Sequence, residues 1–232
     1  MDLHIFPKVD DVTACTRMAQ TLMIAGYSTV GLTIPTSLLP ERVKSIRQTF
    51  QDQGIATALR IDLGSPSRTE LLRSLRRFRN VYDVVGVKCV NARVATVASR
   101  DRRVDVVFFD AGMHNVRFTH SLARLLHGAL EVNLMASLFA LTDTGILFRL
   151  RRTIAVAQEH NVKVVLSSGA RGAEMVRGPR QLSAIASTLG LSETASVAGV
   201  SSVPLSIITE NVKKRQPEYV EEGVKIIVSS RR

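Results

Sequence analysis

Polar residues stand directly after several short apolar runs of the sequence. The runs are rich in β-branched residues and have the length of strands buried on both faces, as in a parallel sheet. Ligand sites of parallel α/β folds lie at the carboxyl ends of the strands, so these polar residues are the first candidates for acid–base, metal or phosphate chemistry. They are His4, Thr33, Asp62, Lys88, Asp110, Asn133, Ser167–Gly169 and Ser201–Ser202.

A metal-dependent phosphoesterase is one interpretation of these residues. The segment Asp2-Leu3-His4 resembles the opening of polymerase-and-histidinol-phosphatase barrels, where a His-x-His pair begins a metal cluster. Here the second histidine position is Phe6, which cannot bind metal, and His120, His127 and His160 fall on expected helices. A metal centre needs several ligands that converge at bonding distance. We therefore expect His4 to be a hydrogen-bonded strand residue, and keep the metal-dependent phosphoesterase as the alternative.

The segment Ser167–Ala170 could bind phosphate through backbone N–H groups, because it follows the seventh expected strand. Arg171, Arg177 and Arg180 follow closely and could clamp phosphate oxygens. The alternative is a tight turn with solvated arginines, and the sequence leaves both open. Sequence motifs for nucleotide cradles, GxGxxG after a strand and GxxxxGK[ST], are missing.

Two further residues are weaker candidates for catalysis. Asp110 could act as a general base, although we expect a buried, hydrogen-bonded carboxylate at that strand end. Cys89 beside Lys88 is a weak candidate nucleophile.

The expected elements alternate strictly between strand and helix. Ser67 and Glu70 have the spacing of a helix cap, a helical pattern covers residues 144–160, and Pro179 and Gly190 are placed to begin and end another helix. Eight such units predict a closed (β/α)₈ TIM-like barrel over residues 1–215, with a doubly wound open sheet as the competing architecture. Residues 216–232 form a tail that could add a strand. The expected strands are 3–6, 29–34, 55–63, 84–87, 104–109, 130–134, 162–166 and 195–200.

The charge of the chain is strongly positive. Its 232 residues include 31 Lys and Arg against 20 Asp and Glu, a formal net charge of +11, and 45% hydrophobic residues argue against general disorder. Ten basic residues and only three acidic ones lie between Gly64 and Arg103. Arg73, Arg76 and Arg77 share one helix face, where like charges repel unless an anionic partner binds. With 5% aromatic residues and no Trp, we expect contact with phosphate and folded RNA shape, not base stacking.

Cysteine content and hydropathy indicate in which cellular compartment the protein is expected. Cys15 and Cys89 are too few for a disulfide framework or a cysteine zinc site, which agrees with a reducing cytoplasm. We find no signal peptide, and the apolar stretch 134–150 is too short and too interrupted for a membrane span. We therefore expect a cytoplasmic protein with no membrane partner.

Four segments in order resemble one family. They are Val104–Asp110, Lys163–Ala170, Arg177-Gly178-Pro179 and Ala198–Ser201. To about Arg215 the chain resembles archaeal ribonuclease P protein component 3, the homologue of the thirty-kilodalton subunit of the eukaryotic enzyme. Gly178 departs from the Ser/Pro surroundings usual in the family.

The resemblance implies a barrel related to the phosphoesterases but without their metal cluster, which agrees with Phe6. It implies a noncatalytic subunit of an RNA-based endoribonuclease that removes the 5′ leader from precursor tRNA. Implied partners are the ribonuclease P RNA, protein component 2, the other ribonuclease P proteins and precursor tRNA. Mg²⁺ would belong to the RNA, and this chain would need no cofactor.

The expected RNA contacts have two sources. Matching by position to the family gives Lys88, Arg93, His114, Arg117, Arg171, Arg177 and Lys213, and charge patterning adds Arg73, Arg76, Arg77 and Arg180. A third possibility, compatible with RNA binding, is a structural barrel that binds another protein through the apolar tail residues Val224, Ile226, Ile227 and Val228.

Overall fold

The computed structural model describes residues 1–110, 115–134, 144–216, 219–221 and 224–225. Seven parallel strands lie side by side in the order of the chain. They are β1 (Asp2–Ile5), β2 (Thr29–Thr33), β3 (Ala56–Leu63), β4 (Val84–Lys88), β5 (Val106–Phe108), β6 (Ala129–Asn133) and β7 (Val164–Ser167).

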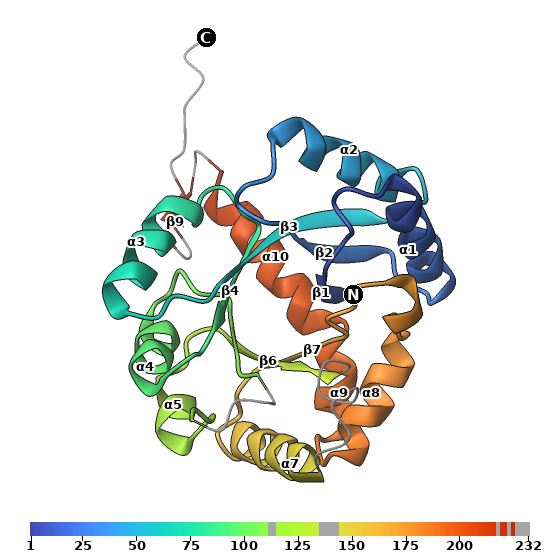
Figure 1. The fold of residues 1–232 in the computed structure, drawn as a ribbon. Coiled ribbons are helices and arrows are strands. Elements are labelled where there is room, and N and C mark those ends of the chain that lie inside the picture. Colours follow the sequence, from blue (N-terminus) through green and yellow to red (C-terminus); the bar gives the residue numbers. More distant parts are fainter. Residues whose placement is uncertain (111–114, 135–143, 217–218, 222–223, 226–232) are drawn as a thin grey trace.

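The sheet curves into a nearly closed barrel with helices around it (Figure 1). The segment after β7 returns to β1, where Ile5 forms an isolated parallel bridge with Ala170 and the Phe6 N–H donates to the Ala170 carbonyl at 2.9 Å. The predicted TIM-like architecture is confirmed, and the doubly wound open sheet is excluded by this curvature.

The helices alternate with the strands as predicted up to β7, after which α8, α9 and α10 follow one another. Ser67 caps α3 by accepting a hydrogen bond from the Glu70 N–H at 3.3 Å. Pro179 begins α8, and Gly190 follows it with a φ of +106°. The helices are α1 (Val12–Ile24), α2 (Pro40–Gln51), α3 (Arg68–Phe78), α4 (Ala92–Arg100), α5 (His120–Leu125), α7 (Thr144–Glu159), α8 (Pro179–Thr188), α9 (Glu193–Gly199) and α10 (Ser202–Lys214), with a short 3₁₀ turn, η1 (Ala173–Met175).

The predicted eighth strand over residues 195–200 is wrong, because this segment belongs to helix α9 and its end. Ser192 caps α9 by accepting a hydrogen bond from the Ala195 N–H at 3.3 Å. The sequence analysis overlooked this helix cap because an apolar run follows it. The small residue Gly199 lets α9 lie close to β7, since a Cβ there would come within 3.0 Å of the Val164 carbonyl oxygen and the Leu166 side chain.

Helix α10 covers the amino ends of the strands. Its residues Val203, Ile207 and Ile208 pack against a core cluster that includes Leu3 and Val84. In Figure 1, α10 crosses the barrel opening diagonally. Any site inside the barrel therefore opens at the carboxyl ends of the strands, which we call the mouth.

The described tail residues form a separate two-stranded antiparallel sheet of β8 (Tyr219–Glu221) and β9 (Val224–Lys225). These two strands pair with each other and not with the barrel sheet. Ile226, Ile227 and Val228 lie outside the described residues. Among the described helices, none is both long and apolar enough to span a bilayer.

Candidate functional site

Four charged side chains form a quartet inside the barrel mouth, with His4 of β1, Arg60 of β3 and Glu131 of β6 buried and Asp62 of β3 partly exposed. The two His4 ring nitrogens lie 2.7 Å from Asp62 Oδ2 and 2.7 Å from Glu131 Oε1. Arg60 binds the other oxygen of each carboxylate, at 2.8 Å to Asp62 Oδ1 and 2.5 Å to Glu131 Oε2. Ser167 Oγ donates a further hydrogen bond to Glu131 Oε1 at 2.5 Å.

The quartet is electrically neutral. Burial and Arg60 both act to lower the pKa of His4, but the carboxylates of Glu131 and Asp62 outweigh them and raise it to about 9. Burial acts to raise the pKa values of Asp62 and Glu131, but the charges of Arg60 and His4, with the hydrogen bonds they donate, together outweigh burial and hold both pKa values below their usual range. Two cations therefore face two anions at neutral pH.

This arrangement does not fit the metal cluster of the phosphoesterase alternative. A protonated imidazole cannot ligate a metal, and each oxygen of Asp62 and Glu131 already faces a cation. The Phe6 ring lies 4.6 Å from the His4 ring, where the resembling barrels have a second histidine. Asp2 ties β1 to the loop after β7, since its oxygens accept from the N–H groups of His4 at 3.0 Å and Ser168 at 3.1 Å.

Arg60 and Glu131 were missed by the sequence analysis, although both carry a usable signal. Each interrupts an apolar run that was expected to be buried on both faces. A charge in such a strand must be buried with a partner, because an unpaired buried charge is costly. Both side chains are fully or almost fully buried.

The Ser167–Ala170 loop closes the barrel and does not form the phosphate cradle that was one of the two interpretations. The Ser168 N–H donates to Asp2 and the Ala170 N–H donates to Ser168 Oγ, so both groups are already satisfied. Ser167 and Ser168 are fully buried.

The arginines after this loop have different environments. Arg171 is exposed and stacks over the Phe6 ring, with its guanidinium carbon 4.1 Å from the ring centroid. Arg177 donates to the carbonyls of Glu174 and Val176, both at 2.8 Å, and so braces its own loop. Arg180 is exposed at the start of α8.

The mouth has a basic rim, which we define as Lys88, Arg93, Arg117 and Arg171. Lys88 pairs with Asp110 at 3.0 Å. Asp110 is 49% exposed, so the expectation of a buried carboxylate there is wrong. The loop of Arg117 borders a cavity of about 370 Å³ that Arg149 and Arg152 of α7 also line.

Two residues near the rim need separate mention. His114 lies outside the described residues. Cys89 is fully buried, and burial raises the pKa of its thiol to about 12, so it is not an activated nucleophile.

A second basic surface lies on the outer side of helix α3. We call it the α3 flank and define it as Arg68, Arg73, Arg76 and Arg77, all exposed, around a shallow groove of about 580 Å³. In contrast, Arg79 is used internally, since it pairs with Asp105 at 2.6 Å. Lys213 belongs to neither surface as defined here and lies in the last turn of α10, at the amino ends of the strands. The structure thus divides the predicted contacts that it describes among four places: the rim, the α3 flank, the end of α10, and the start of α8 with Arg177 and Arg180.

Comparisons with known proteins agree with this description. A family model described as RNase P subunit p30 matches residues 1–216. The chain is 27% identical over 210 residues to ribonuclease P protein component 3 of Methanosarcina barkeri, covering 87% of this chain and 84% of that protein.

Two solved structures share the fold. One is a chain in a cryo-EM structure of archaeal ribonuclease P with mature tRNA, with a TM-score of 0.81 and 18% identity over 99% of this chain and 100% of that chain. The other is a putative prolidase from Bifidobacterium longum, with a TM-score of 0.54 and 13% identity over 91% and 69% of the two chains. The match of the family model to almost the whole barrel decides the identity: the chain belongs to the RNase P subunit p30 family.

Proposed function

We propose that this ribonuclease P subunit binds the catalytic RNA through the α3 flank and the rim, and that it does no chemistry itself. The single observation that carries the proposal is the contrast between the two kinds of charge. The buried charges of the mouth are neutralised within the quartet, whereas the α3 flank presents guanidinium groups to solvent.

Repulsion among the arginines of the α3 flank destabilises the helix when no anionic partner is bound. Arg73, Arg76 and Arg77 lie three and four residues apart, and like charges at this spacing destabilise a helix by a few tenths of a kcal/mol per pair. Among the described carboxylates, none forms an ion pair with them. Phosphate groups along an RNA backbone would offset this repulsion. The guanidinium group of one arginine can donate hydrogen bonds to two phosphate oxygens at once.

The family membership supports the partners of the proposal. The RNA subunit would hold the catalytic Mg²⁺ and remove the 5′ leader from precursor tRNA. This chain would pair with protein component 2 and the other ribonuclease P proteins, and stabilise the active RNA fold. The finer assignment of RNA contacts to the rim and the flank rests on charge and exposure.

Removing the charge of the α3 flank tests the proposal. The triple variant Arg73→Ala, Arg76→Ala, Arg77→Ala should bind ribonuclease P RNA more weakly. Its plot of log affinity against log salt should be shallower by about 2 to 3, because each lost phosphate contact removes roughly 0.7 to 0.9 from the slope. Filter binding or fluorescence anisotropy over a salt series measures this.

A matched control removes three positive charges elsewhere. Arg17 of α1, Lys44 of α2 and Lys163, which precedes β7, are exposed and lie outside both proposed surfaces. Their triple alanine variant should keep the wild-type slope within about one unit, since it removes net charge without removing a contact. Equal slopes for the two triple variants would refute the assignment to the α3 flank.

The noncatalytic role is tested by reconstitution. Cleavage of precursor tRNA by the RNA and the other protein subunits should slow, or need more Mg²⁺, when this chain is left out. The chain alone should not cleave the substrate. Unchanged rate and Mg²⁺ requirement without this chain would contradict the proposal.

A further inference from the structure

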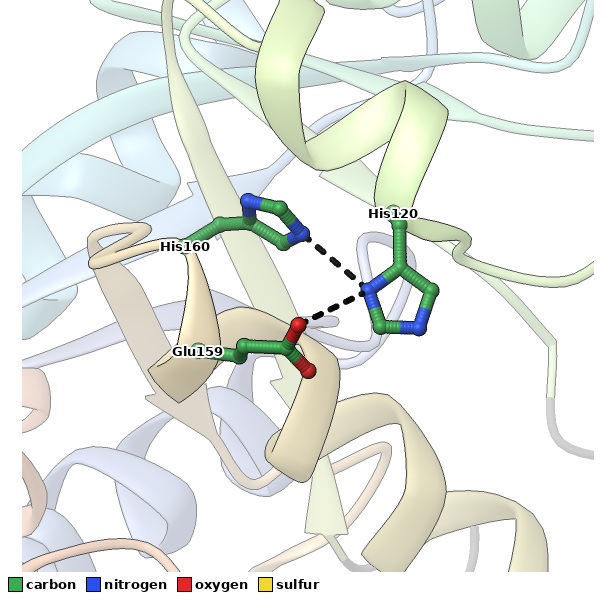
Figure 2. Close-up of side chains that lie close together, drawn as sticks. All are labelled: His120, Glu159 and His160. Atoms are coloured by element: carbon green, nitrogen blue, oxygen red, sulfur yellow. Dashed lines mark hydrogen bonds and ion pairs between the residues drawn. The ribbon is translucent and has the colours of Figure 1, made fainter.

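Three side chains of types that can ligate a metal converge at the ends of helices α5 and α7, and none of them belongs to the quartet or the α3 flank. His120 is the first residue of α5, Glu159 is the last residue of α7, and His160 follows directly. Figure 2 shows the imidazole of His120 facing the Glu159 carboxylate and the His160 ring. Nothing in the proposed RNA contacts explains why these three groups meet.

The distances match those between ligands of a single ion. His120 Nδ1 lies 3.1 Å from His160 Nε2 and 3.6 Å from Glu159 Oε1. One ligand atom from each residue lies within 4.8 Å of the others. Around a tetrahedral zinc with bonds of about 2.0–2.1 Å, neighbouring ligand atoms are about 3.3 Å apart. Small rotations of exposed side chains would bring all three atoms to bonding distance.

The chemistry of the donors selects the class of ion. Two imidazole nitrogens and one carboxylate oxygen suit Zn²⁺ and related transition metals, whereas Mg²⁺ and Ca²⁺ prefer oxygen ligands alone. Glu159 and His160 also stand at the carboxyl end of α7, where the helix dipole favours a cation. The fourth tetrahedral position would be filled by water, because His120 and Glu159 are 52% and 64% exposed.

We propose that His120, Glu159 and His160 form a zinc site that fastens α5 to the end of α7. The two helices lie on either side of β6 in the chain, and both contribute to the cavity lined by Arg117, Arg149 and Arg152. A bound ion would therefore hold together the walls of this arginine-lined cavity. The role is structural, and the binding of the ion does not require any of the proposed RNA contacts.

Titration of untagged, metal-free protein with Zn²⁺ tests the site. Wild type should bind one Zn²⁺, and at a hundredfold excess over the dissociation constant its thermal midpoint should rise by about 5–10 °C. His120→Ala, Glu159→Ala and His160→Ala should each weaken binding at least ~10-fold. Mg²⁺ at millimolar concentration should neither shift the midpoint nor compete.

His127→Ala is the matched control, because His127 is exposed near the end of α5 but outside the cluster. It should bind Zn²⁺ like wild type. Replacement of Zn²⁺ by Co²⁺ should give the visible absorption of a tetrahedral centre in wild type and His127→Ala, and lose it in His120→Ala. Failure of wild type to bind at ~100 µM Zn²⁺, or equal binding by wild type and His120→Ala, would overturn the proposal.

Discussion

His4 shows how one buried residue links protonation to stability. Its pKa is about 9 in the folded protein because Glu131 and Asp62 face it, against about 6.5 for an unperturbed histidine. The folded state therefore holds a proton in a pH range where the unfolded chain has released it. The stabilisation from this proton is complete below about pH 6.5 and is lost as the pH rises towards 9.

We expect the free energy of unfolding to fall by roughly 2–3 kcal/mol between pH 6.5 and 8.5. Urea unfolding at a series of pH values measures this change, and the His4 ring resonances should titrate near pH 9 in an NMR experiment. Burial lowers the pKa of the Met1 amino group, so that group changes stability in the opposite direction. A flat stability profile together with a His4 midpoint near 6.5 would contradict the quartet.

At the residue scale, strand-end polarity was predictable but pairing was not. His4 and Asp62 were candidates because they are polar residues near the carboxyl ends of two expected strands. Arg60 and Asp62 lie two residues apart on one face of β3, but the contacts that join them to His4 and Glu131 depend on barrel curvature, which brings β1, β3 and β6 to one interior. Sequence spacing within one strand gives no information about that distance.

At the scale of elements, the loop after β7 closes the barrel by joining β7 to β1. Gly169 has a φ of +62°, and a Cβ there would lie 2.1 Å from the Asn133 side-chain amide nitrogen. Gly190 also has a positive φ, of +106°, but a Cβ there would meet nothing within 4 Å. A comparison of alanine substitutions at the two glycines therefore distinguishes the cost of backbone strain, present at both, from the cost of a packing clash, present only at Gly169.

Gly169→Ala should destabilise the protein more than Gly190→Ala. We expect about 1 kcal/mol for the backbone conformation at either site, and a further 1–3 kcal/mol at Gly169 from the displaced Asn133. Chemical denaturation of both variants measures the difference. Equal losses would show that the loop accommodates a side chain and does not close the barrel tightly.

Helix α9 shows what limits prediction of elements. The first seven strands and the cap at Ser67 were predictable from apolar runs and start signals. Residues 195–200 were mistaken for a strand because they form a short, largely apolar run at the spacing of the other expected strands. The Ser192 cap and the small residues Ala198 and Gly199 favour a helix packed closely on β7.

Over the whole molecule, positive charge was predictable in amount and in sequence position, but not in its arrangement. The basic region between Gly64 and Arg103 includes the α3 flank, rim residues and internally paired groups such as Arg79 and Arg103. Only the fold separates arginines that support the barrel from those that face solvent. This separation determines which variants test RNA binding without unfolding the protein.

The rim and the α3 flank make a joint prediction about one RNA molecule. Arg93, Arg117 and Arg171 are exposed around the mouth, and the α3 flank lies on the outer side of the barrel. The rim variant Arg93→Ala, Arg117→Ala, Arg171→Ala removes three of these charges. If a single folded RNA spans both surfaces, the losses of the rim variant and the α3 flank variant should add in the sextuple variant that combines them, because well-separated substitutions that do not contact each other act independently. The sextuple variant should then lose about 4 to 5 from the salt slope. Binding at a series of salt concentrations distinguishes the outcomes, with circular dichroism to verify that each variant folds. A rim variant with the wild-type salt slope would restrict the interface to the α3 flank. A sextuple variant whose slope is no shallower than that of either triple variant would show that the two surfaces do not engage the same RNA together.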